Sequence, residues 1–269
     1  LLRVTDYLAF RIKQINESFF KAIKEVGYKG YYKGVFPVKV NQQAQVIDRI
    51  VDFGKEFDFG LEVGSKPELL IALAHDLSSE STIICNGIKD KEFINLAILS
   101  LKIGFKTILV LESPRELDLI IKVSQELNVK PLLGIRIKLT NKVSGNWSQS
   151  SGDRSAFGMS VEQVMKVIKK LKSYNYLDCL VLQHSHLGSQ IPDIIEIRKA
   201  SQEACRFYSE MSKQGAPLEY LDLGGGLGVD YTGEQKSSLN SINYTLDEYC
   251  INIVETVKYE LDQSNIDHP

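Results

Sequence analysis

The sequence lacks the features that mark membrane proteins, secreted proteins and nucleic-acid-binding proteins. No apolar run approaches the roughly 20 residues that cross a bilayer, and the first residues lack the basic segment and apolar core of a signal peptide. The net charge is −2 over 269 residues, so there is no basic excess for a polyanion. We therefore expect a cytoplasmic globular protein that binds neither nucleic acid nor membrane.

Cysteine is also scarce. The chain has four cysteines, and no two of them have the CxxC spacing of a redox or zinc motif. This pattern predicts reduced thiols buried in a core. The chain does not begin with Met and its last residues resemble an interrupted sequence, so we expect a fragment of a longer protein.

What the chain does contain is a regular alternation of short apolar runs with amphipathic stretches. Seven runs predict strands, at residues 34–41, 57–63, 81–86, 107–111, 131–139, 177–183 and 220–223. Several are apolar throughout, which is typical of parallel strands covered by helices. Right-handed crossovers leave an open doubly wound sheet or a closed barrel. Seven strands with a helix before the first and after the last favour a TIM-like (β/α) barrel one strand short, with its chemistry on the loops that follow the strands.

Four sequence patterns predict capped helix starts. They begin at Ser65, Ser113, Ser160 and Thr245, each followed three residues later by Glu or Gln. A further helix is expected at 193–212. The polar stretch 140–157 interrupts this rhythm, and a connection of that length is either functional or mobile.

A lysine lies inside the first predicted strand. Lys39 stands between Val38 and Val40, and burial would favour its neutral, nucleophilic form, which is suited to forming a Schiff base. The alternative is a lysine that reaches solvent or pairs with a carboxylate.

Glycines follow the seventh predicted strand, at Gly224, Gly225 and Gly226. They let the backbone approach a ligand closely and present N–H groups to a phosphate. Barrels often bind phosphate near the loops after strands 7 and 8. A tight turn that needs positive φ is the alternative.

Histidines follow the sixth predicted strand, and an arginine lies in the fifth. His184 and His186 could stack on an aromatic cofactor, form a zinc pair, or be ordinary loop residues. Ser189 adds a hydroxyl donor. Arg136 needs an anion, which is either a ligand or a structural partner such as Glu62. A buried lysine and a phosphate loop in one barrel indicate either a sugar-phosphate aldolase or a pyridoxal-phosphate enzyme.

Five motifs together resemble the biosynthetic arginine decarboxylases, which belong to the alanine-racemase-like class of pyridoxal-phosphate enzymes. They are FPVKVNQ at 36–42, GLEVGSKPEL at 60–69, ICNG at 84–87, HLGSQ at 186–190 and LDLGGGLGVDY at 221–231. The resemblance runs from about Val26 to the end of the chain, and the segment 145–158 also matches this family.

The resemblance implies a role for each candidate site residue. Lys39 would hold pyridoxal 5'-phosphate covalently, and His186 would stack on its ring as the second catalytic residue. Ser189 and the three glycines would bind the phosphate, and Arg136 would lie near the phenolic oxygen. Substrate contact is implied for Leu221, Asp222, Gly228, Asp230 and Tyr231.

The implied reaction is decarboxylation of L-arginine to agmatine and carbon dioxide, in polyamine (putrescine and spermidine) biosynthesis. The family also implies a homo-oligomer and a need for magnesium, for which the sequence shows no site. A diaminopimelate or ornithine decarboxylase, or a non-catalytic pyridoxal-phosphate-binding regulatory homologue, are the alternatives. We expect residues 1–269 to form one barrel domain without its last strand and without the C-terminal β-domain, and therefore to be inactive alone.

Overall fold

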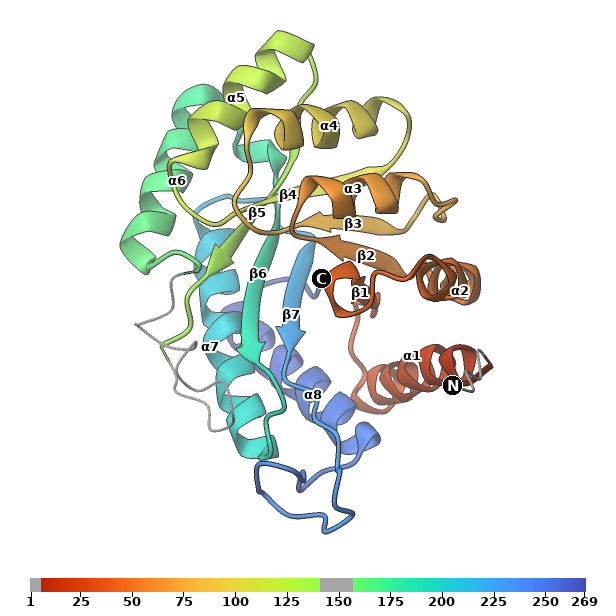
Figure 1. Cartoon of the computed structure of the whole chain (residues 1–269). Coiled ribbons are helices and arrows are strands. Elements are labelled where there is room, and N and C mark those ends of the chain that lie inside the picture. Colours follow the sequence, from red (N-terminus) through yellow and green to blue (C-terminus); the bar gives the residue numbers. More distant parts are fainter. Residues whose placement is uncertain (1–5, 141–156) are drawn as a thin grey trace. The chain divides into compact units, whose positions relative to one another are not determined.

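The computed structural model describes residues 6–140 and 157–269 (Figure 1). The chain divides into two compact units, one of Leu1–Glu17 with Tyr32–Gly134 and one of Ser18–Tyr31 with Ile135–Pro269. Two elements run through both units, helix α1 (Asp6–Val26) and strand β5 (Leu132–Ile137). No helix within the described ranges is long and apolar enough to cross a membrane.

The first unit is a parallel sheet with helices between its strands. Its strands are β1 (Val35–Pro37), β2 (Gly60–Val63), β3 (Thr82–Cys85) and β4 (Lys106–Leu111), hydrogen-bonded in that order and followed by β5. The helices are α2 (Ala44–Gly54), α3 (Lys66–Leu73), α4 (Lys91–Lys102) and α5 (Glu116–Leu127). Helix α3 packs against β2 and α4 against β4, so these strands have no wet face and β2 and β3 are buried throughout.

The second unit continues the same pattern. Strand β6 (Leu180–Gly188) pairs in parallel with β7 (Tyr220–Gly225), and the register shifts between His186 and Gly188. The helices are α6 (Val161–Tyr174), α7 (Ile194–Lys213) and α8 (Leu246–Ser264). The side chain of Gln183 donates to the carbonyl of Ala204 in α7, so odd positions of β6 face the helices and His184 and His186 share the other face.

All seven predicted strands are present, although their ends differ from the prediction. The largest difference is in the first one, where the strand covers only Val35–Pro37 and a 3-10 turn, η1 (Val38–Val40), follows it. The four cysteines are free and buried, as predicted. Residues 141–156, most of the predicted polar connection, lie outside the described residues.

Two of the four predicted helix caps form. Ser160 and Thr245 both make complete capping boxes. Ser65 is the N-cap of α3, as predicted, but the predicted capping hydrogen bonds do not form, because Glu68 binds the backbone N–H of Gly64 and the Ser65 hydroxyl instead.

The cap predicted at Ser113 is wrong, because α5 begins only at Glu116. The carboxylate of Glu116 accepts hydrogen bonds from the backbone N–H groups of Glu112 and Ser113 and from Lys89, a distant partner that a local pattern does not reveal.

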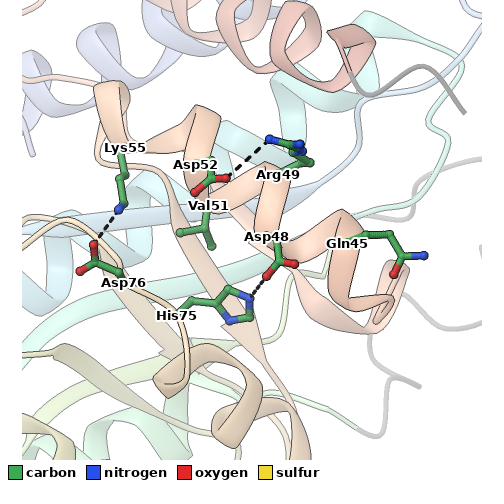
Figure 2. A pocket seen from close by; sticks show the side chains of 8 residues that line it. All are labelled: Gln45, Asp48, Arg49, Val51, Asp52, Lys55, His75 and Asp76. Atoms are coloured by element: carbon green, nitrogen blue, oxygen red, sulfur yellow. Dashed lines mark hydrogen bonds and ion pairs between the residues drawn. The ribbon is translucent and has the colours of Figure 1, made fainter.

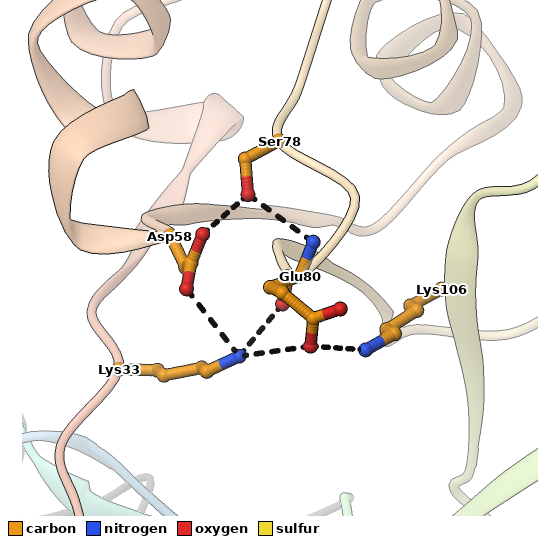
Figure 3. A network of polar contacts seen from close by, with 5 residues as sticks. All are labelled: Lys33, Asp58, Ser78, Glu80 and Lys106. Carbon is orange, nitrogen blue, oxygen red and sulfur yellow. Dashed lines mark hydrogen bonds and ion pairs between the residues drawn. The ribbon is translucent and has the colours of Figure 1, made fainter.

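A polar network joins the segments that enter the strands of the first unit (Figure 3). The ammonium of Lys33 donates to the carbonyl of Glu80 at 2.8 Å and lies 3.9 Å from the carboxylates of both Asp58 and Glu80. Lys106 reaches Glu80 at 2.5 Å, and the Ser78 hydroxyl donates to Asp58. These residues precede or begin β1 to β4, at the strand ends where barrels carry stability rather than chemistry.

Candidate active site

Lys39 lies at the end of the first strand, but in a different setting from the one predicted. It belongs to the 3-10 turn η1, and its side chain is 62% exposed, so the prediction of a buried lysine inside a strand is wrong. The strand ends at Pro37, and the tighter turn carries Lys39 out of the layer that buries Val38. Its ammonium lies 3.7 Å from the carboxylate of Glu62, whose side chain is only 12% exposed.

The carboxylate of Glu62 is held from its other side by an amide. Asn86 donates from Nδ2 to Oε1 of Glu62 at 3.2 Å, and both residues are buried. The amide oxygen of Asn86, Oδ1, is buried and has no hydrogen-bond partner among the described residues. Glu62 was a predicted partner of Arg136, but its carboxylate is engaged by Lys39 and Asn86.

A second cation lies deeper in the same unit. The side chain of Lys89 is fully buried and its ammonium lies 3.3 Å from Glu116, which is 8% exposed. Lys89 also donates to the carbonyl of Gly87, whose N–H donates to Glu112 at 3.0 Å. This ion pair is not predictable from the sequence, because its partners follow different strands. It fixes the loops after β3 and β4.

In the second unit, a histidine and an aspartate form a pair across neighbouring strands. Nδ1 of His184 lies 2.7 Å from Oδ2 of Asp222, its register partner on β7, and His184 is buried. Gly224 makes room for this ring, since a β-carbon there would lie 2.9 Å from Cε1 of His184. Asp222 is therefore bound to His184, whatever its role toward a substrate.

The glycine turn is shaped by the protein around it. Gly225 and Gly226 have φ of +76° and +90°, which L side chains rarely adopt. A β-carbon on Gly225 would lie 2.2 Å from the carbonyl oxygen of Gly188 and 3.0 Å from Nε2 of His186. The exposed His186, near the end of β6, therefore lies beside the turn, and the exposed Ser189 follows the strand. The positive φ of the alternative prediction is confirmed, and the approach of the backbone to a ligand stays a prediction.

Two buried tyrosines hold this turn, and neither was predicted. The hydroxyl of Tyr244 lies 2.8 Å from the carbonyl of Ile191 and 3.3 Å from that of Gly226, and it accepts from the N–H of Gly228 at 2.9 Å. Tyr249 donates to the carbonyl of Gly225 at 3.2 Å. Burial raises the pKa of Tyr244 to about 12, so its hydroxyl keeps its proton.

The residues implied to contact substrate lie in or after β7. Leu221 is half-buried in the strand, and Tyr231 is 73% exposed. Asp230 accepts from the backbone N–H groups of Gly233 and Gln235 at 2.9 and 3.1 Å. Hydrogen bonds, the largest from Ser241, hold the pKa of the Asp230 carboxyl below its usual value. Gly228 is buried and packs closely on Ile242, since a β-carbon at position 228 would lie 2.5 Å from that side chain.

Arg136 is half-buried near the end of β5. Its guanidinium lies 5.3 Å from the centre of the Phe157 ring, within the range of a cation–π contact. An aromatic face is thus a second kind of partner for this arginine, beside the anion that its sequence position predicts.

Comparison with known proteins identifies the family. The sequence model described as "Pyridoxal-dependent decarboxylase, pyridoxal binding domain" matches residues 12–262. The chain belongs to this family.

Relatives of this pyridoxal binding domain carry one recurring name. The chain is 49% identical over all of its 269 residues to the biosynthetic arginine decarboxylase of Prochlorococcus marinus (strain MIT 9301), of which it covers 42%. It is 45% identical, with the same coverage, to the biosynthetic arginine decarboxylase of Gloeobacter violaceus. The chain therefore spans less than half the length of the curated relatives it matches.

Solved structures agree on the fold. The biosynthetic arginine decarboxylase from Campylobacter jejuni matches 98% of the chain with a TM-score of 0.88 and 35% identity, over 43% of its own length. A diaminopimelate decarboxylase from M. jannaschii matches 97% of the chain with a TM-score of 0.75, and at 24% identity this match bears on the fold alone. The predicted fold class, the parallel (β/α) barrel of the alanine-racemase type, is confirmed.

The two units of the pyridoxal binding domain each contain groups that fit the cofactor. The first unit offers an exposed amine on Lys39 and a buried, unpartnered amide oxygen on Asn86. The second unit offers the exposed imidazole of His186, which lies beside Gly225 in the glycine turn. A residue with a β-carbon would not fit at Gly225. The aldehyde of the cofactor bonds to an amine, and its pyridine ring stacks on a flat side chain. Its phosphate binds backbone N–H groups that no other acceptor uses.

A further hollow of about 420 Å³ lies on the helices of the first unit (Figure 2). His75 stands in it with Nδ1 2.7 Å from the carbonyl of Ile71 and Nε2 2.9 Å from the carboxylate of Asp48. The pair links α2 to the residues that follow α3. No group of three or more metal-binding side chains occurs in the described part of the chain, so the expected magnesium has no candidate site there.

Proposed function

We propose that the protein containing this chain decarboxylates L-arginine to agmatine and carbon dioxide with pyridoxal 5'-phosphate. The observation that carries the proposal is 49% identity over the whole chain to a protein named biosynthetic arginine decarboxylase. The exposed amine of Lys39 supports it, because a lysine that is to bond to an aldehyde has to be accessible.

Each candidate residue would have its own role toward the cofactor. Lys39 would attach it, His186 would lie against its ring, and Arg136 would bind near its phenolic oxygen. Ser189 and the turn of Gly224, Gly225 and Gly226 would bind its phosphate. When bound, the cofactor supplies an electron-withdrawing ring for the carbon that loses carbon dioxide.

Glu62 would act on Lys39 directly. Its carboxylate stands 3.7 Å from the ammonium and is anchored by Asn86. This contact keeps the Lys39 side chain at the end of β1. Glu62 and Asn86 would therefore position Nζ of Lys39.

The substrate contacts would come from β7 and the segment that follows the glycine turn. The assigned residues are Leu221, Asp222, Gly228, Asp230 and Tyr231. Hydrogen bonds hold the pKa of the Asp230 carboxyl below its usual value, and a carboxylate suits a cationic substrate such as arginine. Agmatine would serve putrescine and spermidine synthesis. We also propose a homo-oligomer in the cytoplasm that uses magnesium, and one barrel domain formed by residues 1–269.

The test uses the complete protein and a matched pair of lysines. Adding pyridoxal 5'-phosphate should give an absorbance band at roughly 420 nm that is absent in Lys39→Ala. Lys91→Ala, which removes another half-exposed lysine of the same unit, should keep the band. A band that survives in Lys39→Ala contradicts the assignment of Lys39.

The substrate is tested separately. Carbon dioxide release should be fastest with L-arginine in a panel that includes ornithine and diaminopimelate. A preference for either of the other two would correct the substrate. Binding of the cofactor without release from any of them would support a regulatory homologue instead.

A further inference from the structure

The loop after β6 and the turn after β7 are joined into one structure by hydrogen bonds. The N–H of Gly226 donates to the carbonyl of Gly188 at 2.9 Å, and the N–H of Ile191 donates to the carbonyl of Gly226 at 3.2 Å. Gln190 exchanges two hydrogen bonds with the backbone of Val229, at 2.6 and 2.8 Å. The two loops that carry the predicted phosphate ligands are therefore not independent.

Four N–H groups of the joined loops are already used. Gly226, Gly228, Val229 and Ile191 all donate within the protein. Within residues 157–269, by contrast, the N–H of Leu227 has no acceptor, and Leu227 is 37% exposed. An N–H that is left open in a turn of this kind is what an anion binds.

The direction of the Leu227 N–H follows from its peptide plane. In a trans peptide, the carbonyl and the next N–H point to opposite sides. The carbonyl of Gly226 is held by the N–H of Ile191, with the hydroxyl of Tyr244 also within 3.3 Å. The Leu227 N–H of the same peptide therefore points away from Tyr244 and Ile191.

Tyr244 is the residue that fixes this arrangement. Its single hydroxyl bridges the carbonyl of Ile191 and the N–H of Gly228, at 2.8 and 2.9 Å, and so joins three segments of chain. Tyr244 is only 6% exposed, so no water replaces the hydroxyl without a rearrangement. Without it, Ile191 would lose the restraint that orients its own N–H toward Gly226.

We propose that Tyr244 is a positioning residue for phosphate binding, and that the backbone N–H of Leu227 is a direct donor to the phosphate of the cofactor. This rests on the proposed function, which assigns the phosphate to this turn. The N–H of Gly226 is not available to the phosphate, because it donates to the carbonyl of Gly188.

The experiment compares pyridoxal 5'-phosphate with pyridoxal, which lacks the phosphate. Both are titrated against the complete protein. The dissociation constant of pyridoxal divided by that of pyridoxal 5'-phosphate isolates the contribution of the phosphate. Tyr244→Phe should lower this ratio by about tenfold, the effect of weakening one hydrogen bond to a charged group. A general loss of packing would weaken both ligands alike and leave the ratio unchanged.

Tyr208→Phe is the matched control. Tyr208 is also buried, and its hydroxyl donates to the carbonyl of Leu218 at 2.8 Å, away from both loops. It should lower stability without changing the ratio. A native ratio in Tyr244→Phe would overturn the role of Tyr244.

A second pair of variants tests the donor. Leu227→Pro removes the N–H, whereas Leu227→Ala keeps it, so only the proline variant should lose the preference for the phosphorylated ligand. If the proline variant does not fold, the amide signal of Leu227 in native ¹⁵N-leucine-labelled protein should shift on adding inorganic phosphate. An unshifted signal or an unchanged ratio in Leu227→Pro would overturn the donor assignment. Equal affinity of the native protein for both ligands would instead contradict the phosphate site of the proposed function.

Discussion

A β-carbon on Gly225 would lie 2.2 Å from the carbonyl oxygen of Gly188, closer than any real contact allows. Gly225 also has a φ of +76°. We expect Gly225→Ala to lower the free energy of unfolding by about 3 kcal/mol, combining left-handed strain with displacement of the loop after β6. Binding of pyridoxal 5'-phosphate should weaken with it. Urea unfolding and a cofactor titration measure the two effects.

Gly233 separates these two causes. Its φ is +71°, but no atom lies within 4 Å of a β-carbon built there. Gly233→Ala should cost only the conformational part, about 1 kcal/mol. Equal costs at both positions would mean that the approach of Gly188 has no energetic weight.

The buried ion pair of Lys89 and Glu116 should be costly to break. Lys89→Met leaves the Glu116 carboxylate buried without its cation, and we expect a loss of about 3 kcal/mol in the free energy of unfolding. Lys89→Met with Glu116→Gln should recover part of this loss, because no uncompensated charge remains. Chemical denaturation of the three proteins measures it.

The control for this prediction is another lysine–glutamate pair in the same unit. Lys91 and Glu126 lie 2.9 Å apart with side chains 51% and 43% exposed. Lys91→Met should change the free energy of unfolding by less than about 1 kcal/mol. A similar loss at both lysines would show that burial is not the cause.

Asp247 should make stability depend on pH. The Ser18 hydroxyl, and then Lys21, hold the pKa of its carboxyl below the usual value. A lowered pKa in the folded state means that the contribution is complete above the unfolded value, about 3.9, and is lost as the pH falls through the folded value. Asp247→Asn should therefore lower stability at pH 7, by on the order of 0.5 kcal/mol because the pair is exposed.

Thermal unfolding at pH 7, 5 and 3 checks the sign. The difference between the native protein and Asp247→Asn should shrink toward the lowest pH. A difference that stays constant or grows as the pH falls would contradict the assigned cause.

The thiols should be inert in the folded protein. Burial raises the pKa of Cys85 and Cys250 to about 12, and it raises the pKa of Cys205 as well. The thiolate is the reactive form, so alkylation at pH 8 should be slow until the protein is unfolded. Peptide mapping by mass spectrometry reports each cysteine. Rapid labelling of native Cys85 would contradict its burial.

The fold was predictable where local signals agree with distant contacts. Apolar runs locate all seven strands because each strand is buried by neighbouring elements. The caps at Ser160 and Thr245 need only residues within one turn. The cap at Ser113 fails because α5 begins only at Glu116, whose carboxylate also binds Lys89, a partner that no local pattern contains.

The candidate site was predictable as a set of residues and less so as geometry. Lys39 stands at the end of a strand, as its position indicates, but whether a 3-10 turn or the strand carries it decides its exposure. The pairing of Asp222 with His184 depends on the register of two strands that are distant in sequence. Tyr244 and Tyr249 carry no motif of their own, and only the folded turn shows what their hydroxyl groups do.

The stretch between Val229 and Tyr244 has a practical use. Val229 is bonded to Gln190 and Tyr244 to Ile191, while residues 231–237 between them are exposed. Lengthening a loop whose two ends are fastened costs little entropy. A short reporter peptide inserted near Ser237 would thus lie in the same connection as Tyr231, after the Gly233 and Gln235 amides that hold Asp230, and could signal ligand arrival.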